Sequence, residues 1–187
     1  MSGRRWQLLK ACRALSNGGV IAYPTETVWG LGCDPSDEAA VRSLLTIKQR
    51  PVQKGLLLIA ANTAQLEPYI VALTPAKMRK IVNTWPGPHT WLFTATERVP
   101  PWIRGEHATV AVRVTSHPLA AALCQQFGRP IVSTSANLSG YAPAKSEILV
   151  RRHFWDKVAY VLPGENGPHA TPSEIRDAQT GVVVRAG

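Results

Sequence analysis

The chain has 187 residues, of which 45% are hydrophobic and 18% charged, and these values are typical of a globular protein with one hydrophobic core. No apolar run approaches the ~20 residues that a membrane-spanning helix requires, and Lys10 and Arg13 interrupt the stretch in which a signal peptide would have its apolar segment. We therefore expect a single domain over residues 1–187, a cytoplasmic location and no membrane contact.

Charge and cysteine usage narrow the class of protein further. Lys and Arg number 21 against 12 Asp and Glu, and the net charge of +9 favours contact with a polyanion but also serves solubility. Three cysteines lie far apart and the histidines are scattered, so we expect neither a disulfide framework nor a metal site built from protein side chains. The chain also lacks the P-loop, the dinucleotide-binding glycine motif and the Gly-x-Ser-x-Gly hydrolase motif.

The predicted secondary structure begins with a helix and a strand. Apolar residues at helical spacing predict a helix over 6–15, and the next apolar run predicts a strand over 20–23. Pro24 cannot donate a hydrogen bond to a sheet, so we expect the strand to end there and residues 25–27 to form a polar loop.

The next predicted helix ends beside two cations. Asp34 followed by Pro35 resembles an N-cap and a first helical residue, so a helix is expected from there to Lys48. Pro51 disfavours helical geometry at Arg50, which therefore lies just beyond the end of the helix. The two side chains can converge on one anionic ligand, although cations at a solvated helix end would follow the same pattern.

Strands and helices continue to alternate in the rest of the chain. An apolar run over 55–61 predicts a strand that is covered on both faces and therefore central in a sheet. The other expected elements are strands over 90–96, 109–114, 131–132 and 160–162, helices over 74–82, 118–127 and 146–155, a loop over 163–172, and a closing antiparallel hairpin over 173–176 and 182–185. This alternation predicts an α/β fold with a twisted, mixed, largely covered sheet.

Polar side chains follow several of these strands. Residues 133–137 (STSAN) come directly after the strand at 131–132, and Arg113 faces away from the three valines of its own strand. Ligands of open α/β sheets bind beyond strand ends, so Thr25, residues 133–137 and Ser173 can line one cleft. A capping turn at 133–137 and a structural ion pair for Arg113 are the alternatives that these residues leave open.

Five stretches, in this order along the chain, resemble the YrdC/TsaC family, and the resemblance covers essentially the whole chain. They are residues 23–27 (YPTET), 48–51 (KQRP), 85–88 (WPGP), 111–114 (AVRV) and 133–140 (STSANLSG). The resemblance implies the family's twisted α/β fold with a basic concave cleft, in its short bacterial form. It also implies the synthesis of threonylcarbamoyl-AMP and pyrophosphate from L-threonine, bicarbonate or CO2, and ATP, which is the first step of the t6A modification of tRNA.

The same resemblance implies roles for residues around the nucleotide. Lys48 and Arg50 match the family's Lys-x-Arg signature and are the expected catalytic groups. Ser135 and Asn137 match the Ser-x-Asn signature that binds ATP with them, and Arg185 lies where a further nucleotide contact is expected. Mg2+ is expected to accompany ATP and to bridge its phosphates.

A second group of residues is implied for threonine. Thr25, Arg113 and Ser173 match positions that the family associates with the amino acid, and Ser133 lies where a further substrate contact is expected. Arg113 can bind a carboxylate through two parallel hydrogen bonds, which would account for a cation on a strand face. No side chain is identified as a general base.

Three positions depart from the family pattern. Trp29 stands where Tyr or Phe is more common, Glu174 follows Ser173 where a smaller Thr is common, and His89 replaces an apolar residue. We expect the changes at Trp29 and Glu174 to reshape the threonine end of the cleft.

Two other functions compete with this interpretation. A module that binds double-stranded RNA or tRNA without catalysis would also explain the net charge of +9. A related domain occurs in hydrogenase-maturation carbamoyltransferases, but the zinc-finger and acylphosphatase-like segments of those proteins are missing here. As partners of an enzyme we expect its three substrates, tRNA or double-stranded RNA, and the threonylcarbamoyl transferase proteins that act downstream.

Overall fold

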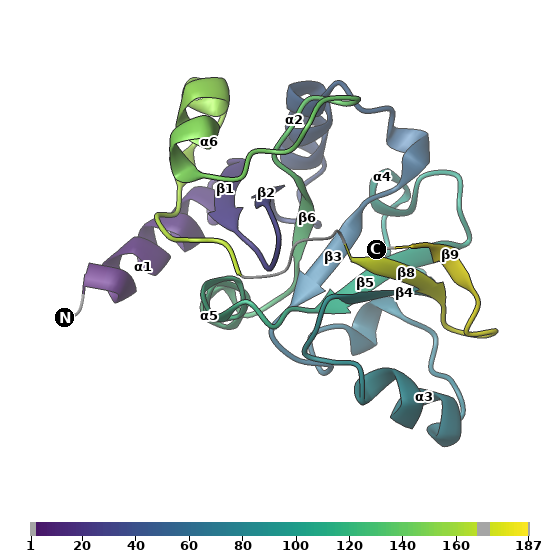
Figure 1. Cartoon of the computed structure of the whole chain (residues 1–187). Coiled ribbons are helices and arrows are strands. Elements are labelled where there is room, and N and C mark those ends of the chain that lie inside the picture. The colour runs from purple at the N-terminus through teal and green to yellow at the C-terminus, as the bar shows by residue number, and fades with distance from the viewer. Residues whose placement is uncertain (1–2, 168–172, 187) are drawn as a thin grey trace.

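The structure, a computed structural model, describes residues 3–167 and 173–186, and one sheet runs through this part of the chain (Figure 1). Its strands lie in the order β7-β1-β2-β6-β3-β5-β4-β8-β9. They are β1 (Ile21–Pro24), β2 (Trp29–Gly32), β3 (Leu57–Ala60), β4 (His89–Thr94), β5 (Thr109–Val114), β6 (Ile131–Ser135), β7 (Tyr160–Val161), β8 (Glu174–Asp177) and β9 (Val183–Arg185). The pairs β1–β7, β3–β5 and β4–β8 are parallel and the other neighbours antiparallel, so the sheet is mixed.

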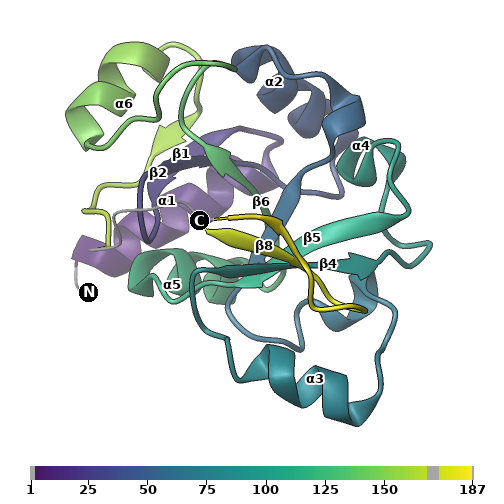
Figure 2. The ribbon, with the colours of Figure 1, turned by 45° about the vertical axis from the view of Figure 1, so that its right-hand side comes forward.

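Helices pack against the sheet in two groups (Figures 1 and 2). They are α1 (Gly3–Ser16), α2 (Glu38–Lys48), α3 (Pro75–Val82), α4 (Pro101–Arg104), α5 (Pro118–Phe127) and α6 (Glu147–Phe154), with the short 3-10 helices η1 (Val52–Lys54) and η2 (Glu67–Tyr69). Leu15 of α1 and Leu123 of α5 share one buried cluster with Ile59 of β3. Leu44 of α2 and Phe154 of α6 belong to the other.

Strand β5 places alternate side chains on opposite faces near the middle of the sheet. Val110, Val112 and Val114 are buried in the larger apolar cluster. Arg113 points to the other face, as the alternation of the sequence predicts. A cationic side chain thus lies over the central strands.

Most of the predicted elements are confirmed. Helix α5 begins at Pro118 and ends at Phe127, where Gly128 caps it with a positive φ of 80°. The apolar run at 55–61 contains the central strand β3, and the closing hairpin is formed by β8 and β9. Of the loop predicted over 163–172, residues 168–172 lie outside the described part of the chain.

The predicted start of α2 is wrong. Asp37, not Asp34, caps the helix with its carboxylate, so the first helical residue is Glu38. Asp34 instead accepts hydrogen bonds from the backbone and the hydroxyl of Ser36 and pairs with Arg129 at 2.6 Å. Both acids are good caps, and the packing of the turn selects the second.

Strand β2 was not predicted, and β6 is longer than predicted. Gly30 and Gly32 hide the alternation of β2 because they supply no side chain on one face. A Cβ atom at Gly32 would lie 2.4 Å from the carbonyl oxygen of Val132, so a larger residue would push the strands apart. Residues 133–135 continue β6 as its last residues rather than forming a turn. In the described part of the chain, no helix has the length and apolarity needed to cross a bilayer.

Candidate active site

A cavity of about 550 Å³ opens on the sheet face opposite the β5 valines. Successive side chains of a strand point to opposite faces, so alternate residues of neighbouring strands line this cavity. These residues are Thr90 and Leu92 of β4, Thr109, Ala111 and Arg113 of β5, Ser133 and Ser135 of β6, and Ser173 and Ile175 beside and within β8. The loop between β1 and β2 and the segment after α2 complete the wall.

Two guanidinium groups repel each other at one wall of the cavity. Arg50 lines it from the segment after α2, and Arg185 lines it from β9. Burial and the neighbouring Arg185 lower the pKa of Arg50. Nη2 of Arg50 donates to the carbonyl oxygen of Gly55 at 2.9 Å, but its Nε is buried without a hydrogen-bond partner among the described residues. This arrangement favours an anion with several oxygens, such as a phosphate chain.

Lys48 lies behind this wall and joins the two signature stretches. Its Nζ donates to the carbonyl oxygens of Ser135 and Asn137 and, at 3.1 Å, to Oδ1 of Asn137. The hydroxyl of Ser135 donates to the same Oδ1 at 2.6 Å. Burial and the charge of Arg50 lower the pKa of Lys48 to about 8. All three ammonium donors are used, so in this structure Lys48 holds the residues after β6 in place.

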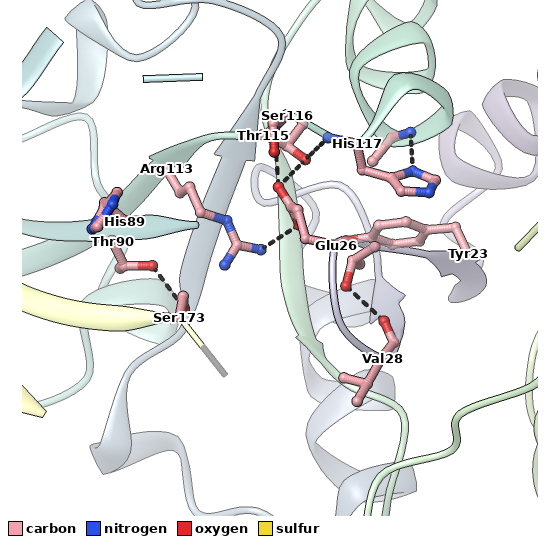
Figure 3. A network of polar contacts seen from close by, with 12 residues as sticks. Tyr23, Glu26, Val28, His89, Thr90, Arg113, Thr115, Ser116, His117 and Ser173 are labelled. Atoms are coloured by element: carbon pink, nitrogen blue, oxygen red, sulfur yellow. Dashed lines mark hydrogen bonds and ion pairs between the residues drawn. The ribbon is translucent and has the colours of Figure 1, made fainter. Parts of the chain in front are cut away.

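A buried ion pair occupies another part of the wall (Figure 3). Nη2 of Arg113 lies 3.4 Å from Oε2 of Glu26, which comes from the loop between β1 and β2. Oε1 of Glu26 accepts hydrogen bonds from the hydroxyl of Thr115 at 2.7 Å and from the backbone N–H of Ser116 at 3.0 Å. Burial raises the pKa of Glu26, but Arg113 and these two donors outweigh it and hold the pKa below its usual value. Glu26 is therefore a stable carboxylate and a weak base.

Hydroxyl groups surround this ion pair. Thr25 is buried and donates from Oγ1 to the carbonyl oxygen of Val28 at 2.6 Å. The hydroxyls of Thr90 and Ser173 lie 3.2 Å apart on the other side of Arg113 (Figure 3). Nη2 of Arg185 donates to the carbonyl oxygen of Ser173 at 3.0 Å, which links the two walls of the cavity.

Known proteins resemble this chain over almost its whole length. The family model Sua5_yciO_yrdC, described as telomere recombination, matches residues 13–187. The chain belongs to the Sua5/YciO/YrdC family. A threonylcarbamoyl-AMP synthase of Nitrosococcus oceani is 50% identical over 99% of this chain and 100% of its own length, and one of Cellvibrio japonicus is 53% identical over 94% and 93%.

A solved member of the Sua5/YciO/YrdC family has the same fold. Crystalline P. abyssi Sua5 complexed with L-threonine superposes with a TM-score of 0.90 at 33% identity. The match covers 96% of this chain but 54% of that protein, which is about twice as long. The resemblance noted from the five sequence stretches is thus confirmed for the family and for the fold.

Within this Sua5/YciO/YrdC fold, the residues expected at the site fall into two groups. Those that line the cavity are Thr25, Arg50, Arg113, Ser133, Ser135, Ser173 and Arg185. Lys48 and Asn137 lie behind the wall and contact it through Ser135. The structure therefore brings the two signature stretches together, mainly through hydrogen bonds between them.

Sequence reasoning missed several cavity residues of this family member. Lys54, Arg104 and His107 line the cavity beside Gly55, and Thr90 lines it from β4. A Cβ atom at Gly55, whose φ is 62°, would lie 3.0 Å from the carbonyl oxygen of Arg104, which shows how closely η1 and the end of α4 approach. No pattern in the sequence joins these segments, because the closeness arises from tertiary packing.

Of the three departures from the family pattern, one lies in the cavity wall and two lie together on the opposite face of the sheet. Trp29 is fully buried and contributes to the cavity wall. Glu174 follows the alternation of β8 onto the opposite face, where its carboxylate lies 3.6 Å from Nδ1 of His89 and accepts a hydrogen bond from Arg176. The Glu174 side chain therefore points away from the cavity, and its effect on the cleft stays a prediction.

The cavity offers few groups that could hold a metal ion. Glu26 is the one acidic side chain among the described residues of its wall. Its Oε1 accepts hydrogen bonds from Thr115 and Ser116, and its Oε2 faces Nη2 of Arg113 at 3.4 Å without a hydrogen bond from any residue that the structure describes. Across residues 3–167 and 173–186, His, Cys, Asp and Glu side chains form no group of three or more that could bind a metal.

Proposed function

We propose that this chain makes threonylcarbamoyl-AMP and pyrophosphate from L-threonine, bicarbonate or CO2, and ATP. The observation that carries the proposal is one cavity with two kinds of charged wall. Arg50 and Arg185 repel each other and pair with no acid in the described part of the chain, whereas Arg113 is paired with Glu26 among hydroxyl groups. The family relatives carry the name of this activity, and the cavity suits both of its charged substrates.

The uncompensated wall is assigned to ATP. Arg50 and Arg185, with Ser135, contact the phosphates, and Lys48 and Asn137 hold the strand end that carries Ser135. Mg2+ would enter as part of the MgATP substrate, held by the phosphates of ATP, and would neutralise part of their charge. Lys54 and Arg104 add positive charge to the same cavity.

The paired wall is assigned to threonine. Arg113 binds the carboxylate with the guanidinium donors that Glu26 leaves free. Thr25, Ser133 and Ser173 surround the rest of the amino acid. Because the carboxylate is held by Arg113, the amine is the group that remains to react.

The reaction needs positioning and charge stabilisation more than a protein nucleophile. The amine of threonine adds to CO2 and loses a proton, which forms a C–N bond and a carbamate. A carbamate oxygen then attacks the α-phosphorus while the bond to the bridging oxygen of the β-phosphate breaks and pyrophosphate leaves. In this proposal Arg50 and Arg185, which both line the cavity, stabilise the negative charge that accumulates on the phosphate oxygens.

The proposal also includes the acceptor of the product and the place where transfer occurs. The product is an activated acyl adenylate, so it requires an acceptor, and we expect transfer proteins that deliver it to tRNA in the cytoplasm. The net charge of +9 supports contact with tRNA.

The direct test supplies ATP, Mg2+, threonine and bicarbonate and omits each in turn while pyrophosphate is measured. Release is expected only in the complete mixture. Pyrophosphate release that continues without threonine, or an RNA affinity with no release at all, would contradict the proposal.

A further inference from the structure

Glu26 links two parts of the chain that both contribute to the threonine wall. It lies in the loop between β1 and β2, next to Thr25, while its three partners Arg113, Thr115 and Ser116 lie at the end of β5 and just beyond it. Glu26 is 3% exposed, and Arg113 is 7% exposed. A single carboxylate therefore connects the loop to the central strand in a region shielded from water.

The contacts of Arg113 leave its orientation dependent on Glu26. Its Nη2 faces Oε2 of Glu26, and its Nε is buried without a hydrogen-bond partner among the described residues. No other acidic side chain of the described chain is placed within ion-pair distance of this guanidinium. Without the carboxylate, a buried cation would be left unpaired and free to turn.

Glu26 itself is held from two sides. Thr115 and Ser116 both donate to Oε1, which directs Oε2 toward Arg113 (Figure 3). The loop that carries Glu26 is anchored as well, because Thr25 donates to the carbonyl of Val28 and accepts at its own carbonyl from the N–H of Gly167 at 2.9 Å. These bonds hold the Glu26 carboxylate in one position, against which the Arg113 guanidinium is oriented.

We propose that Glu26 is a positioning residue for the amino acid substrate: it fixes the guanidinium of Arg113 relative to Thr25, so that an α-carboxylate can bind between the strand and the loop. This inference rests on the proposed function, which assigns both residues to threonine. Glu26 is assigned a role through Arg113 rather than as a proton acceptor: Oε1 accepts two hydrogen bonds, and Oε2, which has no hydrogen bond among the described residues, faces the guanidinium.

The test compares Glu26→Gln with Glu97→Gln, a matched change at an exposed acid remote from the cavity wall. Gln retains an oxygen for Thr115 and Ser116 but loses the charge that orients Arg113. In Glu26→Gln, KM for threonine should rise about tenfold or more while KM for ATP stays within about twofold. Glu97→Gln should change neither constant.

A double variant separates positioning from a purely structural role. If Glu26 acts through Arg113, the rise in KM for threonine in Glu26→Gln/Arg113→Lys should be smaller than the product of the two single rises. Multiplicative effects, an unchanged KM for threonine, or equal rises in both KM values would overturn the inference. If Glu26→Gln is unfolded at the assay temperature, Thr115→Val decides by the same criteria, because it keeps the ion pair and removes one donor to the carboxylate.

A binding measurement distinguishes failure of this inference from failure of the proposed function. If the wild-type protein makes no adenylate, the proposed function fails. The rise in melting temperature on adding threonine is then compared between the wild type and Glu26→Gln. A rise in the wild type that is lost in Glu26→Gln supports the positioning role. A rise that both proteins share, or no rise in either, overturns it.

Discussion

The arginines in the two charged walls of the cavity have opposite electrostatic surroundings. Burial and the nearby Arg185 lower the pKa of Arg50, and among the described residues neither guanidinium pairs with an acid. Arg113 lies against the carboxylate of Glu26, which itself is fixed by two further hydrogen bonds. The first wall suits a ligand with several negative charges, and the second suits one carboxylate whose direction matters. Predictions for variants of the two walls can therefore separate the substrates.

The largest effect is expected at the uncompensated wall. Arg50→Ala should lower kcat/KM for ATP by about 100-fold or more, because a fixed cation that stabilises developing phosphate charge is removed. Arg42→Ala is the matched control, since Arg42 is exposed and pairs with Glu38 on α2. Steady-state kinetics at saturating threonine provide the comparison. Equal losses in the two variants would show that Arg50 has no special role.

The next largest effect is expected at the paired wall. Arg113→Lys keeps the charge but loses the two-pronged geometry, so KM for threonine should rise about 10- to 100-fold. KM for ATP should change little. The alternative that Arg113 is only a structural partner of Glu26 predicts a lower melting temperature with an unchanged KM for threonine.

A smaller, pH-dependent effect is expected at Lys48. Its pKa is lowered to about 8, so the ammonium loses its proton as the pH rises through that value and with it a donor to Ser135 or Asn137. At saturating threonine, kcat/KM for ATP should therefore fall above pH 8 in the wild type. Lys48→Arg stays charged, and in this variant the fall should be absent. A fall of the same shape in both proteins would assign the titration to another group.

The free energy of unfolding should rise with pH above about pH 8, whereas kcat/KM for ATP should fall. Between about 8 and 10.5, the ordinary value of a lysine, the unfolded chain binds a proton at Lys48 that the folded chain has released. The contribution of Lys48 to the free energy of unfolding therefore rises with pH in this window. Urea titrations of the wild type and Lys48→Met at pH 8 and pH 10 would measure the difference. A contribution that falls with pH would contradict the burial of a cationic Lys48.

The smallest effect is expected on the opposite face of the sheet. Glu174→Gln removes a charge that contacts His89 and Arg176 and lies outside the cavity wall. KM for threonine and KM for ATP should each stay within about twofold of the wild type. A selective change in KM for threonine would show that this face communicates with the paired wall.

Residues that line the cavity could be predicted where they lie in short, recognisable stretches. The valines of β5 placed Arg113 on the free face of a strand, and Pro51 placed Arg50 beyond the helix. The burial of these side chains and their hydrogen-bond and ion-pair partners could not be predicted in the same way. The spacing of residues does not show that Lys48 donates its hydrogen bonds to the carbonyl oxygens of Ser135 and Asn137. It also does not show that Arg113 forms an ion pair with Glu26.

The errors in the predicted fold have similar physical causes. Asp34 and Asp37 are equally good caps in sequence, and only the packing of the turn decides between them. Glycines remove the alternation by which β2 would be recognised. Lys54 and Arg104 reach the cavity from segments that tertiary packing brings together, so a local pattern does not identify them.

The central claim is that one cavity joins threonine to ATP through a carbamate. Mass spectrometry of the product formed from ATP, threonine and 13C-bicarbonate tests it most directly. Because Arg113 holds the carboxylate and leaves the amine to react, the adenylate should be threonylcarbamoyl-AMP and should carry the labelled carbon. Unlabelled threonyl-AMP, formed by attack of the carboxylate itself, would contradict the account.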